Sequence, residues 1–428
     1  MPPAPTLVKG MRDLLPPETH WFQAVEAAAR ELFARYGYRE IRTPILERTE
    51  LFARTVGEET DIVGKEMYSF LDRDQTSLTL RPEATAAVAR AYVEHRLWEQ
   101  PGWTRLYYLG PMFRRERPQQ GRYRQFSQIG AELLGGDAPQ MDAEMLVMLA
   151  RLLDRLGLSG WTLSLNSLGC AEDRPRFERA LREALLPIAP RLCGDCRRRA
   201  ETNPLRVLDC KRPEDQPLIA QLPTTLDLLD PPCREHFEQV KQLLERAGVP
   251  YQLQPRLVRG LDYYTRTAFE FVHGALGAQN ALLGGGRYDL LAERLGAPKG
   301  AGAGIGFALG EDRLVSAWRA GLAPSDPPPA AEIYLAPLGE AALAPALELA
   351  EQLRQAGLSV AAGDARWSAK KHLSTASRQA ARWAVLIGEQ EIQARQATVK
   401  TLANGEQSAV AWPQLAEFFA TASGAARA

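Results

Sequence analysis

The chain has 428 residues, of which 45% are hydrophobic and 24% are charged, so it can bury a substantial core in two or three domains. Its 52 Lys and Arg residues balance its 52 Asp and Glu residues, which excludes a strongly basic or acidic protein but leaves local patches open. No window holds the roughly 18 apolar residues of a membrane span, and the N-terminal sequence lacks the apolar core of a signal peptide. Five cysteines, an odd number, do not predict a disulfide framework. We therefore expect a cytoplasmic protein with no membrane partner.

The first predicted elements are a helix and a series of strands. Apolar residues recur at helical spacing from Trp21 to Tyr36, and Gly37 follows as a C-terminal cap. Alternation predicts a strand over 38–46, where Pro44 suits a strand edge or end. Further strands are predicted at 77–83, 105–116, 123–135, 161–169, 257–272 and 280–291, and a helix at 142–156. Because many of these strands follow one another through short turns, the pattern favours an α+β fold with a mainly antiparallel sheet flanked by helices.

Changes in composition predict the domain organisation. Residues 171–246 are helical, charged and cysteine-containing, which is typical of an inserted subdomain. The Pro-rich stretch 320–331 predicts an exposed linker. Beyond it, strand-like runs alternate with helices at 342–356 and 374–381, which indicates a small α/β domain. We expect one domain over 1–325, with the helical insertion, and a linker and second domain over 326–428.

The densest group of charges lies in the predicted hairpin 110–132. Arginines crowd both strands and the loop, at positions 114, 115, 117, 122 and 124, with few acidic residues nearby. Such a hairpin is ordinarily a solvated, charged surface. The arginine guanidinium also matches phosphate oxygens, however, and an aromatic ring beside it can stack on a base. The excess of cations favours a phosphate site here.

Four other segments carry glycines, charged residues or tyrosines in patterns that suggest a binding site. In "LTLRPEATAAVAR", Glu83 and Thr85 stand where a helix begins, and simple helix capping is the alternative interpretation. "GAGIGFALGEDRL" is a glycine-dense strand that ends beside Arg313, and "LLGGGRYDLL" has three successive glycines, which allow close approach of a ligand or only tight packing. Neither is a Walker or dinucleotide motif. "LVRGLDYYTRTAFEFV" interleaves charges and tyrosines in a strand-like run.

In this order, the motifs resemble those of a class II aminoacyl-tRNA synthetase, and specifically the histidyl-tRNA synthetase family. The likeness runs from "GMRDLLP" and "YGYREIRTPILE" (motif 1) through "MFRRERPQQGRYRQF" (motif 2) to "GIGFALGEDRL" (motif 3). "RGLDYYTRTAFE" and "GGGRYDLL" resemble the two histidine-specific segments, and the C-terminal region resembles an anticodon-binding domain. The resemblance implies a class II catalytic core, followed by an α/β anticodon-binding domain.

The resemblance also implies roles for individual residues. Around histidine it places Glu83, Thr85, Arg114, Gln128, Glu132, Arg259, Tyr263 and Tyr264; around ATP it places Arg114, Glu116, Arg122, Phe126 and Arg313. Arg259 and Arg114 would act on the α-phosphate as the catalytic pair, and Arg313 on the γ-phosphate. Ala84 stands where the family usually has glycine, and Ser127 where it often has histidine; neither position supplies a fixed charge.

The implied reaction is histidine–tRNA ligation, in which L-histidine and ATP, with Mg²⁺, give histidyl-adenylate, and histidine then passes to the 3′ end of tRNA(His). The resemblance of motif 1 implies a homodimer. The alternative is a non-catalytic, histidine-sensing regulatory paralogue that partners ATP phosphoribosyltransferase. Such a paralogue typically lacks the C-terminal domain and the intact segment around Arg259, both of which this sequence has.

Two further groups of residues suggest binding. Cys193 and Cys196 with Cys210 have the first half of a zinc spacing, with Cys233 or His236 as a fourth ligand, but the second C-x2-C is missing. Buried thiols are therefore the favoured interpretation, and we assign no metal-ligating residue; Mg²⁺ is expected only with ATP. In the C-terminal domain the basic residues are Arg366, Lys370, Lys371, Arg378 and Arg382. The last three recur at helical spacing, which predicts a short basic face for RNA or an ordinary solvated helix face.

Overall fold

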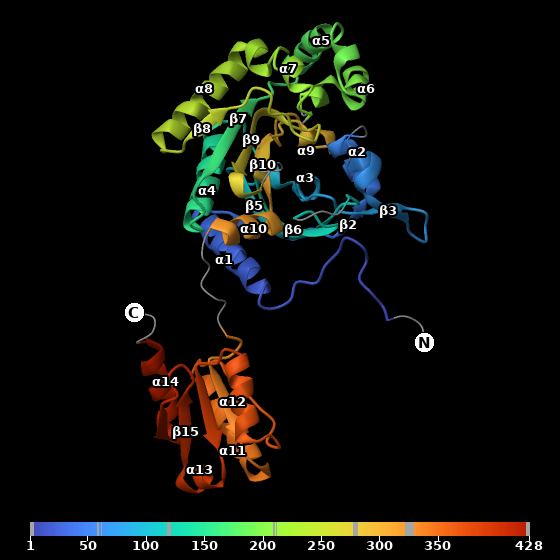
Figure 1. Cartoon of the computed structure of the whole chain (residues 1–428). Helices are drawn as coiled ribbons and strands as arrows, with labels where there is room; N and C mark the ends of the chain where they lie inside the picture. The colour runs from blue at the N-terminus through green and yellow to red at the C-terminus, as the bar shows by residue number, and fades with distance from the viewer. Residues whose placement is uncertain are drawn as a thin grey trace. The chain divides into compact units, whose positions relative to one another are not determined.

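The computed structural model describes residues 4–57, 60, 62–117, 121–208, 210, 212–276, 281–321 and 329–424. Its internal contacts separate two compact units, Met1–Pro324 and Ser325–Ala428. Each unit has its own sheet and its own buried core (Figure 1). Most of the predicted linker, residues 322–328, lies outside the described residues. None of the helices in the described ranges has the length and apolar character needed to cross a membrane.

A large sheet of eight strands forms the centre of the first unit. Its order is β1 (Arg39–Glu40), β5 (Thr104–Phe113), β6 (Gln125–Leu134), β11 (Gly304–Gly310), β10 (Ala281–Arg287), β9 (Thr265–His273), β7 (Trp161–Ser167) and β8 (Tyr251–Leu253). Only the outer pairs β1–β5 and β7–β8 are parallel. The expectation of an α+β fold with a mainly antiparallel sheet is confirmed.

Helices cover this sheet with their apolar faces. They are α1 (Thr19–Arg35), α4 (Pro139–Arg155), α8 (Pro231–Arg246) and α10 (Glu311–Gly321). The predicted apolar stripe of α1 is buried, and Gly37, with a φ of +77°, follows its end. Helix α1 packs against α4 and α10 (Figure 1). The ring of Phe33 on α1 meets Phe307 of β11, with centroids 6.1 Å apart. The helical periodicity of the sequence therefore identified the face that meets the sheet.

A second, three-stranded sheet lies beside the start of α3 (Thr85–Glu94). Its order is β2 (Leu46–Arg48), β4 (Ser77–Leu80) and β3 (Tyr68–Leu71), and α2 (Thr49–Val56) follows β2. The single strand predicted over 38–46 was therefore wrong. The segment divides into β1 and β2, which belong to different sheets, with Pro44 between them. Proline cannot donate a ladder hydrogen bond, and the Arg81 guanidinium instead binds the carbonyl of Thr43 at 3.0 Å.

The strand predicted over 257–272 is also shorter than expected. Only Thr265–His273 forms β9, and residues 257–264 are irregular. Side chains satisfy the carbonyl groups of this segment in place of a neighbouring strand. Asn166 donates to the carbonyl of Leu257 at 2.9 Å, and Arg206 donates to that of Gly260 at 3.0 Å. Local β-propensity was therefore overridden by tertiary contacts.

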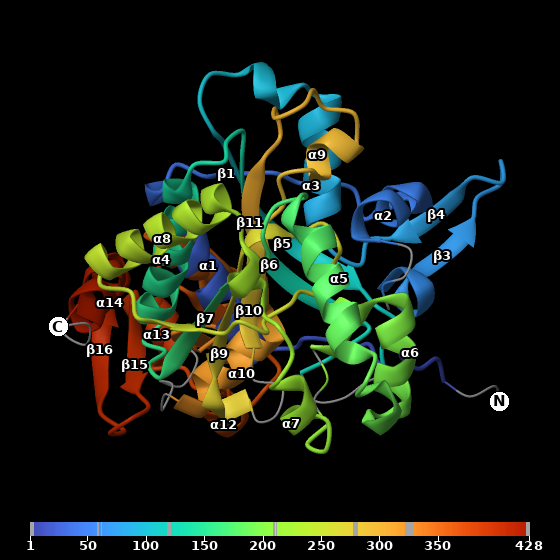
Figure 2. The same cartoon turned by 90° about the horizontal axis from the view of Figure 1, so that it is seen from above.

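The region 171–246 contains a small helical subdomain and one core helix. The subdomain comprises α5 (Asp173–Leu185), α6 (Gly194–Thr202) and α7 (Gln216–Ile219). It has a core of its own, with Phe177, Leu181 and Cys196 buried in it. Figure 2 shows α5 and α6 on one side of the large sheet, while α8 lies with α4 on the other side. Helix α8 is therefore part of the main core rather than of the subdomain.

The second unit is a five-stranded mixed sheet with helices. The strand order is β13 (Val360–Ala362), β12 (Ile333–Pro337), β14 (Trp383–Ile387), β15 (Gln396–Thr401) and β16 (Gln407–Ala411), and the helices are α11 (Leu343–Gln355), α12 (Ala369–Arg378), α13 (Glu389–Ala394) and α14 (Leu415–Gly424). The helix predicted at 374–381 begins earlier, at Ala369. Its start is set by Ser368, whose hydroxyl accepts a hydrogen bond from the N–H of Lys371 at 3.4 Å.

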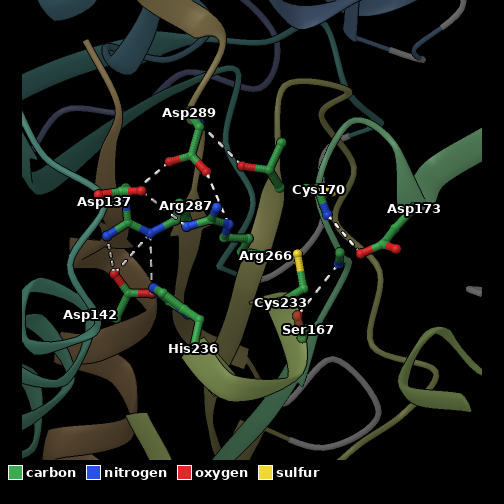
Figure 3. Close-up of polar contacts among 12 residues, drawn as sticks. Asp137, Asp142, Ser167, Cys170, Asp173, Cys233, His236, Arg266, Arg287 and Asp289 are labelled. Carbon is green, nitrogen blue, oxygen red and sulfur yellow. Dashed lines mark hydrogen bonds and ion pairs between the residues drawn. The ribbon is translucent and has the colours of Figure 1, made fainter. Parts of the chain in front are cut away.

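A buried ion pair joins β10 to α4 in the first unit. Arg287, the last residue of β10, has no exposed side-chain surface and donates from Nε to Asp142 Oδ1 at 3.0 Å. Figure 3 shows Arg287 directed at Asp142, with His236 beside the same carboxylate. Burial lowers the pKa of His236. Arg287 also donates to Asp289 at 3.0 Å, so its charge is neutralised within the protein.

We predict that Asp142→Ala lowers the free energy of unfolding by about 3–5 kcal/mol, because it leaves the Arg287 guanidinium buried without its main partner. Urea denaturation of the full chain, followed by circular dichroism, measures this change. The control is Glu144→Ala on the same helix. Glu144 pairs with Arg105, but both side chains are partly exposed, so we expect a loss below about 1 kcal/mol. Equal losses in the two variants would contradict the importance of the buried pair.

Candidate active site

One cavity of about 290 Å³ in the first unit brings together the residues that the sequence analysis assigned to substrates, except Glu132. They are Glu83, Thr85, Arg114, Glu116, Arg122, Phe126, Gln128, Arg259, Tyr263, Tyr264 and Arg313. They come from the start of α3, the β5–β6 hairpin, the irregular segment before β9, and the start of α10. Segments far apart in the sequence thus form the walls of a single site.

Glu132 is not part of this lining and lies near the C-terminal end of β6. It has no exposed surface, and its Oε1 accepts a hydrogen bond from the hydroxyl of Thr85 at 2.7 Å, while Tyr288 donates to Oε2. Burial raises the pKa of Glu132 to about 8. The strand opposite has Gly306 in register with Glu132. A Cβ at Gly306 would lie 1.6 Å from Glu132 Oε2, so only glycine leaves room for the carboxyl group.

Tyr263 and Tyr264 line the cavity, and Tyr288 packs against Tyr263 outside its lining. The centroids of Tyr263 and Tyr264 are 4.6 Å apart, and Tyr288 packs edge-on to Tyr263 at 5.8 Å. Burial raises the pKa of all three hydroxyl groups, which keeps them protonated and able to donate. The sequence analysis missed Tyr288 as a site residue, although the signal was present in "GGGRYDLL". The result is an aromatic wall with hydroxyl and carboxyl groups directly behind it.

Arg259 projects from the irregular segment before β9. It forms an ion pair with Glu270 of β9, and its guanidinium lies 5.7 Å from the centre of the Tyr264 ring. Burial by itself would lower the pKa of Arg259, but its interactions with Glu270, Tyr263 and Tyr264 together outweigh burial and raise the pKa. A Cβ at Gly284 would come within 2.6 Å of Arg259 Nη1. The first glycine of the GGG motif therefore makes room for this guanidinium.

A second group of charges comes from the β5–β6 hairpin and α10. Arg114 donates from Nε to the carbonyl of Pro82 at 2.9 Å and lies over the Phe126 ring at 5.4 Å. Arg122 pairs with Glu116 at 3.0 Å. Burial, together with the charge of Arg122, lowers the pKa of Arg313. Anions entering this cavity would meet arginines on more than one wall.

The residues at the start of α3 both begin the helix and line the cavity. Glu83 accepts backbone hydrogen bonds from Thr85 at 2.7 Å and Ala86 at 2.9 Å, so it caps the helix while it lines the cavity. Ala84 is fully buried, with φ −113°, in ordinary right-handed conformation, so its methyl group causes no backbone strain. Gln128 Oε1 has no hydrogen-bond partner among the described residues. The Gln128 amide is therefore available to a ligand.

The predicted cysteine group forms, but with a different fourth member. Cys193, Cys196 and Cys210 lie together with Asp215, all donor atoms being within 4.8 Å of one another. The expectation that Cys233 or His236 would be the fourth ligand was wrong. Both residues lie on α8, which packs against α4 in the main core. The sequence analysis missed Asp215, since its position five residues after Cys210 matches no common metal spacing.

The basic residues of the second unit only partly share a face. Lys370, Lys371 and Arg378 lie on α12, and Lys371 Nζ is 4.0 Å from the centre of the Trp367 ring. The prediction that Arg382 continues the helical face was wrong, because α12 ends at Arg378. Arg382 instead stacks on Trp383 at 4.3 Å and pairs with Glu332 at 3.5 Å. Arg366 pairs with Asp364 next to the helix.

Comparison with known proteins connects this geometry to a family. The profile of the histidyl-tRNA synthetase family matches residues 10–173 and 216–314. The chain belongs to the histidyl-tRNA synthetase family. A profile described as an anticodon binding domain matches residues 332–421. Residues 174–215, which the synthetase profile leaves out, include most of the helical subdomain. The anticodon-binding profile matches the second unit, which a regulatory paralogue was expected to lack.

The similarity extends over nearly the whole chain. A histidine–tRNA ligase of Koribacter versatilis is 54% identical over 420 residues, which is 96% of this chain and 94% of that protein. One of Solibacter usitatus is 54% identical over 94% of this chain and 95% of that protein. The crystal structure of apo histidyl-tRNA synthetase from S. aureus superposes with a TM-score of 0.80 at 35% identity, covering 97% and 99% of the two chains. The chain is an aminoacyl-tRNA synthetase of the histidine type, which uses ATP.

We predict that the stability of Glu132→Gln relative to the unsubstituted chain increases as the pH rises from 5 to 8. With a pKa of about 8 when folded, against 4.5 ordinarily, Glu132 holds a proton in the folded state that the unfolded state releases in this range. Folding therefore becomes less favourable as pH rises, by on the order of a few kcal/mol. Glutamine does not titrate and removes this dependence. Thermal denaturation across this pH range measures the difference.

A second buried carboxyl provides the comparison for this test. Burial also raises the pKa of Glu311, at the start of α10, to about 8. Glu311→Gln should therefore show the same trend with pH. A stability difference that stays constant between pH 5 and 8 for Glu132→Gln would show that this carboxyl is ionised in the folded protein.

Proposed function

We propose that this cavity is where the chain activates L-histidine with ATP, before histidine passes to the 3′ end of tRNA(His). The observation that carries the proposal is the meeting of two kinds of surface in one cavity. Arginines suited to phosphate line it together with two tyrosines suited to an imidazole ring, and the buried carboxyl of Glu132 accepts a hydrogen bond from Thr85, which lines the same cavity. The histidine carboxylate would attack the α-phosphorus, its new P–O bond forming as the bond to the diphosphate oxygen breaks. Histidyl-adenylate and diphosphate are the products.

The arginines would stabilise the charge that this reaction moves. Negative charge shifts onto the α-phosphate oxygens and the departing diphosphate. Arg259 and Arg114 are assigned to the α-phosphate, and Arg313 to the γ-phosphate. The support is their geometry: Glu270 and the carbonyl of Pro82 hold the first two in place. Cations that are already oriented need no reorganisation during the reaction. Glu116, Arg122 and Phe126 would surround the adenosine and its phosphates.

Histidine would lie against the tyrosine wall. Glu132 is assigned to an imidazole nitrogen, close to Tyr263 and Tyr264, because its carboxyl group is held at a fixed position by Thr85 and Tyr288. Glu83 and Thr85 are assigned to the α-amino group and its surroundings. Gln128 lines the cavity and is assigned to the carboxylate side, where its side-chain N–H groups would donate. These contacts would orient the reacting oxygen towards ATP.

Three further proposals accompany this function. Mg²⁺ would enter with ATP, held mainly by phosphate oxygens and water; Glu116 and Glu270 are carboxylates of the cavity wall that fit such an ion. It would neutralise phosphate charge. We also propose that the chain acts in the cytoplasm. We infer that it forms a homodimer, since the motif 1 region exposes apolar side chains such as Ile45 and Leu46. Light scattering of the purified chain would report its oligomeric state.

We predict that Arg259→Ala lowers histidine-dependent ATP–diphosphate exchange by about 100- to 1000-fold, because its charge acts mainly as the phosphate reacts. Histidine affinity, measured by calorimetry, should change far less. The control is Arg105→Ala, which removes a partly exposed arginine that pairs with Glu144 outside the cavity, and exchange should persist. Equal losses of exchange and histidine affinity in Arg259→Ala would contradict the assigned role.

We predict that a chain ending at Pro329 still forms histidyl-adenylate but aminoacylates tRNA poorly. The first unit has its own core and contains the whole cavity, whereas the second unit matches anticodon-binding domains. Phosphate contacts position RNA and weaken as salt rises, while base contacts select the tRNA. Exchange and tRNA charging are measured for both lengths at matched protein and salt concentrations. Equal charging by the two would exclude the second unit from tRNA recognition.

A further inference from the structure

The helical subdomain gathers three thiols and one carboxylate from separate elements. Cys193 caps the N-terminus of α6, and Cys196 lies in the first turn of that helix. Cys210 follows η4 (Pro204–Val207), and Asp215 precedes α7. Their donor atoms all lie within 4.8 Å of one another. We propose that these four residues bind one Zn²⁺ ion, at a structural site separate from the catalytic cavity.

The arrangement is close to what tetrahedral coordination requires. Zn–S bonds of about 2.3 Å correspond to distances of about 3.8 Å between ligand atoms. Donor atoms within 4.8 Å of one another reach this geometry through inward shifts of less than about 1 Å, within the freedom of rotamers. The C-x2-C pair is already folded back on itself, since the N–H of Cys196 donates to Cys193 Sγ at 3.4 Å. Such backbone donors stabilise a thiolate.

Among the residues that the structure describes, Asp215 has no cationic partner. Its side chain is fully buried, and among the described residues neither Lys nor Arg forms an ion pair with it. Its carboxylate instead accepts from the N–H of Cys193 at 3.1 Å and from the thiol of Cys210 at 3.3 Å. A buried carboxylate is costly unless it is paired with a charge or a metal. Zn²⁺ would supply the missing charge and replace the thiol proton.

A second cluster in the same region shows the contrast. Cys170, Asp173, Asp230 and Cys233 also lie within 4.8 Å of one another, and Figure 3 shows three of them. Here one of the two carboxylates has a cationic partner. Asp173 pairs with Arg176, and Asp230 caps α8 by accepting from the N–H of Cys233 at 2.7 Å. This cluster has only two thiols, so it is the matched control for metal binding.

The proposed ion would join α6 to α7. The subdomain that contains these helices also contacts the segment that carries Arg259. Ile219 of α7 accepts a hydrogen bond from Arg256 Nε at 2.9 Å. Arg206, between Cys196 and Cys210, donates to the carbonyl of Gly260 at 3.0 Å. The subdomain thus forms hydrogen bonds with the chain on both sides of Arg259. A metal that fixes the subdomain would also hold this segment in place, acting through position and not through contact with substrates.

The test is the metal content of the full-length chain. The chain is produced without an affinity tag in zinc-supplemented medium and purified without chelators, and zinc is measured by mass spectrometry. We expect close to one zinc per chain. Replacement by Co²⁺ should give the thiolate-to-cobalt absorption expected for three sulfur ligands. Cys196→Ser and Asp215→Asn should each reduce bound zinc at least tenfold, whereas Cys233→Ser in the control cluster should retain it.

Several outcomes would overturn the proposal. One is less than about a tenth of a zinc per chain, with no thiolate absorption after addition of Co²⁺. A second is equal loss of zinc in Cys233→Ser, which would place the metal in the other cluster. A third is a disulfide between Cys193 and Cys196 in the freshly purified chain. If Cys196→Ser fails to fold, the zinc content and cobalt spectrum of the unsubstituted chain, together with Asp215→Asn, still decide the question.

Discussion

The burial of one carboxyl group, that of Glu132, places demands on every element around it. Removing a carboxyl group from water is costly unless hydrogen bonds compensate, and here they come from Thr85 on α3 and Tyr288 after β10. The neighbouring strand must carry glycine at position 306, because a side chain would occupy the space of the carboxylate. The sheet order β6–β11–β10 and the entry point of α3 are thus linked by one functional group. The same burial raises the pKa of Glu132.

The short segment around β10 links the two sides of the cavity. Gly284 leaves space for the guanidinium of Arg259, and Gly286 leaves space for the ring of Tyr264. Arg287 then anchors the strand to α4 through Asp142 in the core, and the next residue, Tyr288, donates to Glu132. Successive residues therefore contact the proposed phosphate side, the framework of the unit and the proposed imidazole side. Movement of this strand would disturb all of them together.

The two units of the chain carry different parts of the proposed function. The cavity lies entirely within the first unit, while the second unit has an independent core and belongs to the anticodon-binding type. In the first unit the helical subdomain is more than a surface addition, since Arg256 and Arg206 tie it to the chain on both sides of Arg259. A segment that presents Arg259, the proposed catalytic arginine, without being part of a regular strand needs such external support.

The sequence by itself determined the fold class, the helix from Trp21 onwards, the order of the motifs and most of the charged and aromatic residues of the cavity wall. Periodicity and residue chemistry are local properties, and the histidine-specific segments are distinctive. Only the tertiary structure decided that residues 257–264 are irregular, that the strand around Pro44 divides between two sheets, and that Arg382 leaves the face of α12. It also brought Asp215 to the three cysteines and Tyr288 to Glu132. Each of these features is set by contacts between residues that lie far apart in the sequence. The spacing of residues along the chain does not show which distant groups come into contact.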